Sequence, residues 1–455
     1  MRYLYAIRAG LLCTTLSMSG TILSAQQLSP LTLSDAVAAA LGANPDRQIA
    51  KASVDSAQVG ARLVRTALLP NLSFNESVTR GNDPVYVFGT RLRQQAFTQS
   101  DFALSRLNRP TPVNNFTTRF AGSWTAFDSW RTQHEIHRAD LMIQSATASA
   151  KRSDQETVLR TVQAYDAILF AQRRVEVAES GVETARALLS ASQTRVAAGM
   201  AVDSDKLTAD ANLAERQQEV IATQGSVDVA WAELEAAIGK AIAAEQRKLA
   251  PLAERTFDDL PLPERVSLAM KSRLDRQSLA LQNDAQRTAV QSARSAFGPQ
   301  LSTYGSWEMD KSSLVGAGGN NWVAGAELRI DLIPAAKRQN LAAARIEVSR
   351  TEALRAAADR EIQLQVTRCY YEHRTAGQML VVAKTSLSQT EESLRILQER
   401  YGAGLATITE LLRAEDAERQ AKANYWQAVY RNTLTYATLS FADGTLNQNT
   451  AGDLQ

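Results

Sequence analysis

The stretch IQLQVTRCYYEHRTAGQMLVVAKTSLSQTEESLRILQERY, residues 362–401, carries a seam of mostly apolar and small side chains at alternating spacings of four and three. The seam consists of Ile362, Val366, Cys369, His373, Ala376, Leu380, Ala383, Leu387, Thr390, Leu394, Leu397 and Tyr401. An average spacing of about 3.5 residues is typical of a coiled-coil helix, and small seam residues let neighbouring helices approach closely. The stretch therefore predicts long helices packed side by side rather than a thick globular core.

A second copy of this seam lies 205 residues earlier in the chain. It consists of Thr157, Thr161, Ala164, Ile168, Ala171, Val175, Ala178, Val182, Ala185, Leu189, Ser192 and Val196. Further towards the N-terminus, an offset of 229 aligns residues 33–74 with residues 262–303 at twelve identities in 42 positions, where chance gives about two or three. The chain is therefore predicted to contain two structural repeats, each with short helices, a β-hairpin and a long helical hairpin.

The long helices are expected to be unusually extended. No proline or capping signal interrupts residues 131–198, which predicts a helix of about 65 residues and roughly 100 Å. Its counterpart in the second repeat is expected at about residues 336–401. Each helix is expected to end at glycine in the left-handed backbone conformation, and the candidates are Gly199, Gly402 and Gly404.

The helices that return from these turns complete the two hairpins. Asp203 and Thr407 are expected to cap them, because short polar side chains accept hydrogen bonds from the first free N–H groups of a helix. The predicted organisation begins with a signal peptide at 1–25 and ends with a C-terminal tail at 445–455. The first repeat is expected at 26–250, with a β-hairpin near 71–127 and a helical hairpin near 131–238. The second repeat is expected at 251–444, with a β-hairpin near 300–332 and a helical hairpin near 336–440.

Alternation of apolar and polar side chains predicts four β-strands between the helices. Each strand has about ten residues, enough to cross a bilayer when tilted, although an ordinary half-buried sheet shows the same alternation. Four strands cannot close a membrane barrel, so this interpretation requires several chains to share one. The apolar positions are Leu72, Phe74 and Val78; Phe116, Phe120 and Trp124; Leu301, Thr303 and Trp307; and Ala324, Ala326, Leu328, Ile330 and Leu332.

If the strands cross a membrane, four of these side chains are expected to face lipid: Phe120, Trp124, Leu328 and Ile330. The long segment 81–115 joins two predicted strands, and its counterpart is a short loop rich in serine, glycine and asparagine. We expect segment 81–115 to form an extracellular loop, with residues 85–88 folding back into the mouth of the barrel.

Residues 1–25 have the pattern of a secretory signal peptide. Arg2 and Arg8 form the charged start, an apolar core follows, and Ser24-Ala25 precede the expected cleavage site. An uncleaved membrane anchor is the alternative, but the apolar run is short and contains several hydroxyl residues. The signal therefore predicts export from the cytoplasm.

Composition excludes several classes of protein. Of the 50 basic residues two lie in the signal, so the remaining 48 balance 48 acidic residues, which argues against a nucleic-acid partner. Beyond residue 25 there is no uncharged apolar stretch of about 18 residues, so no transmembrane helix is expected. Cys369 is the one cysteine after the signal, which leaves no disulfide and no thiolate cluster for a metal.

No pattern for catalysis or cofactor binding occurs. His134 and His137 lack the four-residue spacing of a helical zinc-protease motif and are expected on a solvated helix face. The glycines at 316, 318 and 319 are expected in a hairpin loop rather than a phosphate cradle, because no helix opens there. We therefore expect no enzyme activity, no catalytic residue, no metal and no cofactor.

The order and spacing of several motifs resemble the TolC-like outer-membrane efflux protein family across essentially the whole mature chain. These motifs are Pro70-Asn71-Leu72 and Pro299-Gln300-Leu301 entering the strands, Phe127-Asp128-Ser129-Trp130-Arg131 starting the long helix, Arg400-Tyr401-Gly402-Ala403-Gly404 at the turn, and Phe441-Ala442-Asp443-Gly444 near the end. The resemblance implies a mainly α fold with a small β part, in which a homotrimer forms an α-helical periplasmic tunnel and a shared 12-stranded β-barrel in outer-membrane lipid. It also implies a passive exit duct of an efflux or type I secretion system, docked at its hairpin turns (Gly199, Gly402, Gly404) onto a periplasmic adaptor protein and an inner-membrane pump.

The resemblance also implies a gate at the periplasmic end. Family members hold this end closed through a Thr-Asp pair on one hairpin and a Tyr near the turn of the other, and Ser204, Asp205 and Tyr401 occupy those positions. The alternative is that Ser204 and Asp205 only occupy the first turn of a helix, where carboxylates are favoured. The family prototype has an arginine in the second turn, where this chain has Ala406, so one gating link is expected to be missing.

A constriction is implied next to the gate. The prototype lines it with two aspartates three residues apart, and this chain has Glu410 and Arg413 there. Three copies of Glu410 make an acidic ring, which Arg413 weakens.

The alternative function is a periplasmic coiled-coil adaptor or scaffold without membrane strands. An adaptor is expected to carry one helical hairpin between small β domains, whereas this chain has two hairpins and four strands of transmembrane length.

Overall fold

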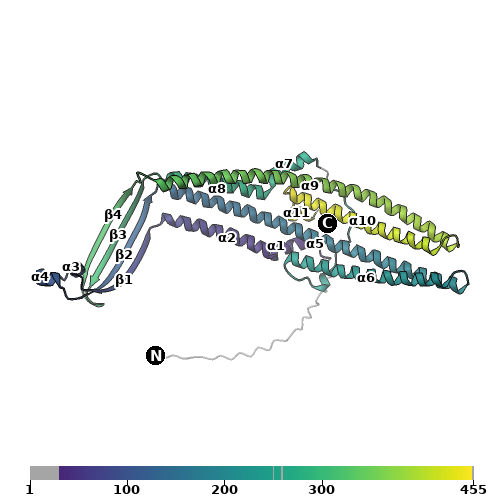
Figure 1. Ribbon diagram of the computed structural model, residues 1–455, viewed down its shortest axis with the longest axis horizontal. Coiled ribbons are helices and arrows are strands. Elements are labelled where there is room, and N and C mark those ends of the chain that lie inside the picture. Colours follow the sequence, from purple (N-terminus) through teal and green to yellow (C-terminus); the bar gives the residue numbers. More distant parts are fainter. Residues whose placement is uncertain (1–29, 250, 258–259, 453–455) are drawn as a thin grey trace, which may run out of the picture.

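The structure, a computed structural model, describes residues 30–249, 251–257 and 260–452. The signal peptide expected at residues 1–25 lies outside these ranges. The described residues form an elongated molecule with a β-sheet at one end and helical hairpins at the other (Figure 1). The elements are α1 (Leu33–Ala43), α2 (Pro45–Arg65), η1 (Thr66–Leu68), β1 (Asn71–Gly81), α3 (Pro84–Arg93), η2 (Gln99–Phe102), α4 (Leu104–Asn108), β2 (Val113–Phe127), α5 (Arg131–Ala197), α6 (Asp203–Ile238), η3 (Ala244–Gln246), α7 (Leu262–Ser272), α8 (Leu274–Ser295), β3 (Gln300–Lys311), β4 (Gly319–Arg329), α9 (Ala335–Gly402), α10 (Ile408–Ala442) and α11 (Gln448–Gly452).

The predicted fold class, mainly helical with four strands and two long helical hairpins, is confirmed. Helices α5 and α9 contain 67 and 68 residues, or about 100 Å each at roughly 1.5 Å per residue. Helix α5 packs against α6 and α9 packs against α10, and α5 also contacts α2, α8 and α10. The second half of the chain thus repeats the element order of the first, with α5 as the helix that joins the two halves.

The strands form one antiparallel sheet in the order β1-β2-β3-β4. A row of aromatic residues, Phe74, Phe120, Trp307 and Trp322, crosses all four strands in register. The rings of Phe74 and Phe120 lie 5.1 Å apart, and those of Phe120 and Trp307 lie 6.0 Å apart. All four side chains are exposed in the single chain, as is Leu328 on the same face. One face of the sheet is therefore an exposed apolar surface.

The opposite face of the sheet is polar. Arg119 and Glu308 are paired in the register, with a guanidinium nitrogen 3.9 Å from the carboxylate. Asn115 donates a hydrogen bond of 2.6 Å to the fully buried Asp310. Helix α3 contacts β2, β3 and β4, and its Arg93 lies 3.5 Å from Glu308. The segment between β1 and β2 therefore folds back over the polar face.

The main hydrophobic core lies midway along the molecule, where α1, α5, α6, α10 and α11 meet. Tyr165 of α5 is 1% exposed, and its hydroxyl donates to the Leu31 carbonyl at 2.9 Å. Leu446, in the segment expected as a C-terminal tail, is fully buried in the same core. The end of the described chain is therefore packed against the helices.

Buried arginines hold the C-terminal end of α10 and explain the motif at residues 441–444. Arg265 and Asp443, both almost fully buried, form an ion pair of 2.6 Å. The Arg152 guanidinium lies 3.5 Å from the centre of the Phe441 ring and donates to the Phe441 carbonyl at 3.0 Å. Arg273 donates to the Ala442 carbonyl at 3.1 Å. Cations are favoured at this end of a helix because its last carbonyl groups lack intrahelical partners.

Three local predictions are corrected by the structure. Helix α6 begins at Asp203 and its N-cap is Val202, so Asp203 is not the cap. Gly402 is the last residue of α9 and stays helical, while Gly404 takes the left-handed conformation. Strand β4 ends at Arg329, opposite the first residue of β3, so Ile330 lies beyond the sheet because no strand remains to pair with it.

The segment between the first two strands is shorter than expected. Strand β1 ends at Gly81 and β2 begins at Val113, so the connection is residues 82–112 rather than 81–115. It contains α3, η2 and α4. Residues 85–88, expected to fold back, form part of α3.

Candidate functional site

The two hairpin turns lie at the end of the molecule opposite the sheet (Figure 1) and share one backbone conformation. Gly199 has a φ of +74° and Gly404 a φ of +75°. In each turn the next N–H donates to the carbonyl oxygen five residues back, at 2.8 Å in both. A left-handed glycine with such a bond is a common way to end a helix. Met200 and Leu405, which carry these N–H groups, are exposed apolar residues at the two tips.

The returning helices begin differently in the two repeats. Thr407 caps α10: its hydroxyl accepts from the Glu410 N–H at 3.3 Å, and the Glu410 carboxylate accepts from the Thr407 N–H at 2.7 Å. The prediction that Thr407 is a cap is confirmed. At the 205-residue offset, Val202 and Asp205 occupy the equivalent positions. Valine cannot accept a hydrogen bond through its side chain, so α6 starts without such a cap.

Tyr401 contributes to the contact between the two tips of one chain. Its side chain is buried in a small cluster that includes Leu188, Ile408 and Leu411. The guanidinium carbon of Arg195, from α5, lies 4.6 Å from the centre of the Tyr401 ring. Arg195 also donates to the Tyr401 carbonyl at 2.8 Å. A cation over an aromatic ring and a hydrogen bond to the same residue together link the first hairpin to the second.

The predicted gate residues lie near this link. Asp205 is half-buried in the first turn of α6, and Ser204 beside it is exposed. Among the described residues, Tyr401 makes its polar contacts between the hairpins with Arg195, not with Ser204 or Asp205. A bond between Asp205 and Tyr401 across neighbouring hairpins stays a prediction. Ala406 is half-buried against the tip cluster.

The predicted constriction residues are both exposed at the start of α10. The pKa of Glu410 is lowered from its ordinary value, first by the hydrogen bond from the Thr407 N–H and then by that from the Thr407 hydroxyl. The nearby cations Arg400 and Arg413 lower it further. Glu410 is therefore a carboxylate at neutral pH, with a structural role in the cap as well as an exposed negative charge.

Sequence reasoning missed Arg195 as a contact between hairpins. A signal was present, because Arg195 aligns with Arg400 at the 205-residue offset, as Ala198 and Gly199 align with Ala403 and Gly404. The offset marks both arginines as features of the turn, but it does not say which side chain crosses to the other hairpin. Arg400 stays in its own turn, with a 3.4 Å hydrogen bond to the Leu405 carbonyl.

Within the described ranges, no group of three or more His, Cys, Asp and Glu side chains is arranged to hold a metal ion. None of the described helices combines the length and the apolar content that a membrane-spanning helix requires.

The sequence profile of the outer membrane efflux protein family matches residues 36–240 and 266–445, one segment in each repeat. The alkaline protease secretion protein AprF of Pseudomonas aeruginosa is 25% identical over 432 residues, which cover 92% of this chain and 85% of AprF.

Solved structures share the fold. The CmeC outer membrane channel of Campylobacter jejuni superposes with a TM-score of 0.76 at 17% identity, over 91% of this chain and 86% of CmeC. The open state of the MtrE outer membrane channel of Neisseria gonorrhoeae gives a TM-score of 0.74 at 17% identity, over 92% of this chain and 90% of MtrE. The family is one of outer-membrane efflux and secretion channels, which are not enzymes. Because the family profile covers most of both repeats, this chain belongs to the outer membrane efflux protein family.

Proposed function

We propose that this protein is the outer-membrane exit duct of a tripartite efflux or type I secretion system. Three copies form a shared 12-stranded barrel in the outer membrane and a helical tunnel in the periplasm. Substrates move passively through this path after an inner-membrane pump and a periplasmic adaptor deliver them. Family membership and the secretion role in the name of AprF support this proposal.

The two faces and two open edges of the sheet carry the proposal. Strands β1 and β4 each have 11 residues and pair on one side only. Long unpaired edges are unfavourable in an isolated chain and require a partner. The aromatic row on one face suits lipid, and the Arg119–Glu308 face suits a water-filled interior. Pairing of β4 with β1 of the next copy satisfies both edges.

The alternative, a periplasmic adaptor or scaffold, leaves this apolar face without a purpose. The segment 82–112 is proposed to lie outside the cell, because it connects β1 and β2 at the end of the sheet away from the helices (Figure 1). The hairpin turns at Gly199 and Gly404 are then the periplasmic ends that meet the adaptor.

Fractionation of cells tests the duct against the alternative. We expect the mature protein in the outer-membrane fraction, as a trimer after chemical cross-linking, and we expect the purified trimer to conduct ions in planar bilayers. A monomer in the soluble periplasmic fraction would contradict the duct.

An epitope inserted after Asn108, an exposed residue at the end of α4, should bind antibody on intact cells. Labelling that requires a permeabilised outer membrane would reverse the proposed topology.

A further inference from the structure

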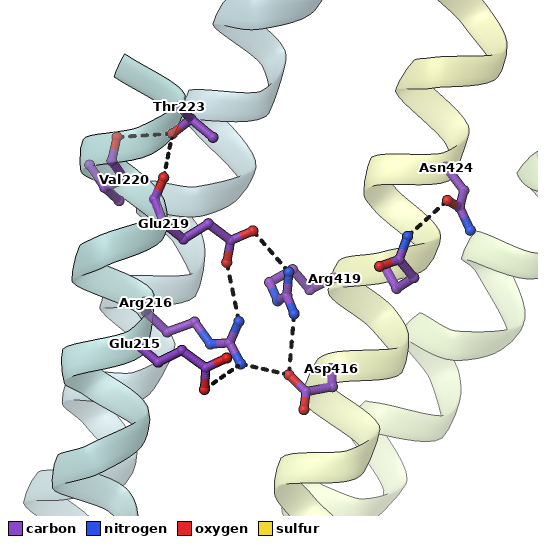
Figure 2. Close-up of polar contacts among 9 residues, drawn as sticks. Glu215, Arg216, Glu219, Val220, Thr223, Asp416, Arg419 and Asn424 are labelled. Carbon is purple, nitrogen blue, oxygen red and sulfur yellow. Dashed lines mark hydrogen bonds and ion pairs between the residues drawn. The ribbon is translucent and has the colours of Figure 1, made fainter. Parts of the chain in front are cut away.

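Four charged residues form a closed ring of ion pairs between α6 and α10 (Figure 2). Arg216 of α6 lies 3.1 Å from Glu219 on its own helix and 2.8 Å from Asp416 of α10. Arg419 of α10 lies 3.0 Å from Glu219 and 3.4 Å from Asp416. Two cations and two anions therefore alternate, and each helix supplies one of each sign.

The ring spans a gap that backbone packing does not close. Helix α10 packs against α5, whereas the backbones of α6 and α10 hardly approach each other. The long side chains of Arg216 and Arg419 bridge the difference. The Arg216 side chain is 7% exposed. A cation that far from water needs its carboxylate partners, because removal of one partner leaves an uncompensated buried charge.

Gly181 of α5 provides the space in which the two arginines meet. A Cβ atom at this position would lie 3.6 Å from Cδ of Arg216 and 3.7 Å from Cδ of Arg419. These are ordinary van der Waals distances, so alanine fits there, but a branched side chain has to displace both arginine stems. Glycine inside a helix costs about 1 kcal/mol relative to alanine. Helix α5 thus carries an unfavourable residue at a position that the stems of both arginines approach closely.

An ion-pair ring can separate more readily than an apolar contact. When the ring opens, water hydrates the four charged groups and offsets much of the lost attraction, because the gain from a buried ion pair is close to its desolvation cost. Apolar surfaces have no such compensation on exposure to water. The ring therefore fixes one geometry of the two hairpins but permits another.

We propose that Arg216, Glu219, Asp416 and Arg419, seated on Gly181, form a lock between the two hairpins of one subunit, separate from the tips. Gly181 lies 16 residues before the end of α5, about 25 Å at roughly 1.5 Å per residue. Release of the lock lets α6 move away from α10 and widens the tunnel near the hairpin turns. This role rests on the proposed function as a duct.

Hydrogen exchange of the purified full-length mature trimer in detergent tests the lock without reference to transport. Glu219→Gln with Asp416→Asn neutralises both acceptors of the ring and leaves both arginines charged, while Glu215, 3.8 Å from Arg216 on the same helix, is unchanged. We expect amide exchange to accelerate about tenfold in the parts of α6 and α10 near the hairpin turns, while exchange in the β-sheet stays unchanged. Gly181→Leu should act in the same direction, and Gly181→Ala, which fits the space and favours the helix, should exchange no faster than the wild type.

Arg395→Gln is the matched control. Arg395 pairs with Glu392 and Glu399 inside α9, so its loss removes two ion pairs without disconnecting the hairpins. Exchange in the acceptor variant that equals exchange in this control overturns the lock, as does wild-type exchange in Gly181→Leu. Bilayer conductance separates the two proposals. Suppose that exchange rises in the ring variants, but neither the wild-type trimer nor any variant conducts ions. The ring then still holds the two hairpins together, and the proposed function as a duct is wrong.

Discussion

The guanidinium of Arg195, two residues before the end of α5, lies over the ring of Tyr401, one residue before the end of α9. The guanidinium carbon is 4.6 Å from the ring centre, and Arg195 donates to the Tyr401 carbonyl at 2.8 Å. Tyr401, which family resemblance assigns to the gate, is therefore already engaged within its own subunit. The contact joins the tips of both repeats at the end proposed to open.

Loss of this contact should loosen the tip. Arg195→Gln removes the cation from the ring, and we expect more frequent or longer open states in planar-bilayer recordings. A gate near balance is sensitive, since about 1.4 kcal/mol changes its populations tenfold. Arg186→Gln is the control, because Arg186 pairs only with Glu183 on the surface of the same helix among its described contacts. Equal open fractions in the two variants would show that Arg195 packs the tip without restraining it.

The gate assigned by resemblance makes a second prediction. If Asp205 bonds Tyr401 of a neighbouring hairpin, Asp205→Ala with Tyr401→Phe should raise single-channel conductance. Phenylalanine keeps the ring beneath Arg195, so the double variant removes the hydroxyl and the carboxylate but preserves the intra-subunit stacking. Ala406 replaces the arginine of the family prototype, so the starting gate is expected to be weaker than in the prototype. Unchanged conductance would show that Ser204 and Asp205 serve only the first turn of α6.

Glu410 should set the charge preference of the channel. Glu410→Gln removes one negative charge per subunit, and glutamine can still bond the Thr407 N–H in a capping box. We expect the reversal potential in a salt gradient to shift towards weaker cation preference, while Arg413→Gln shifts it the other way. Because hydrogen bonds from Thr407 lower the pKa of Glu410, the preference should persist when pH falls into the ordinary range for glutamate. No shift in either variant would place these residues away from the narrowest point.

The apolar face of the sheet should be required for membrane assembly. Leu328→Asp places a charge on the face that carries the aromatic row, at a cost in lipid that depends on depth and lies below the roughly 2–4 kcal/mol of an arginine or lysine at the bilayer midplane. We expect fewer trimers in the outer-membrane fraction. Arg329→Gln on the opposite face, where its ion-pair partner is Asp331 at 3.8 Å, should assemble normally. Normal assembly of Leu328→Asp would contradict contact of this face with lipid.

Glu415 should make stability depend on pH. Burial, and then the neighbouring Asp416, raise its pKa from 4.5 to about 7, against the opposing effect of Arg216. The folded protein therefore holds a proton that the unfolded chain releases above about pH 4.5. Stability should fall as pH rises from about 4.5 through about 7, on the order of 1 kcal/mol after allowance for partial exposure.

Glu415→Gln mimics the protonated form and provides the comparison. Melting temperatures of wild type and variant should agree at pH 5, and the variant should melt higher at pH 8. The same difference at both pH values would mean that ionisation of Glu415 is not responsible.

Local patterns in the sequence predict the elements that repeat along one segment. The seam from Ile362 to Tyr401 and its earlier copy predict α9 and α5, because a spacing of about 3.5 residues places side chains on one helix face whatever lies opposite. Alternation around Phe120 likewise indicates a two-faced strand. Helix caps are harder to predict from the sequence, since Asp203 and Val202 are adjacent and only the backbone conformation shows which one precedes the helix.

Local patterns do not show which residues meet between the hairpins. Arg195 and Tyr401 are 206 positions apart, and Arg216 and Asp416 are 200 apart. Their contacts depend on how far each helix is rotated and shifted along its neighbour, which the periodicity of a single helix does not specify. A shift by one turn, about 5.4 Å, would separate every one of these pairs while leaving both helical patterns intact. The helices follow from local spacing, and the links between the hairpins follow from packing across the whole chain.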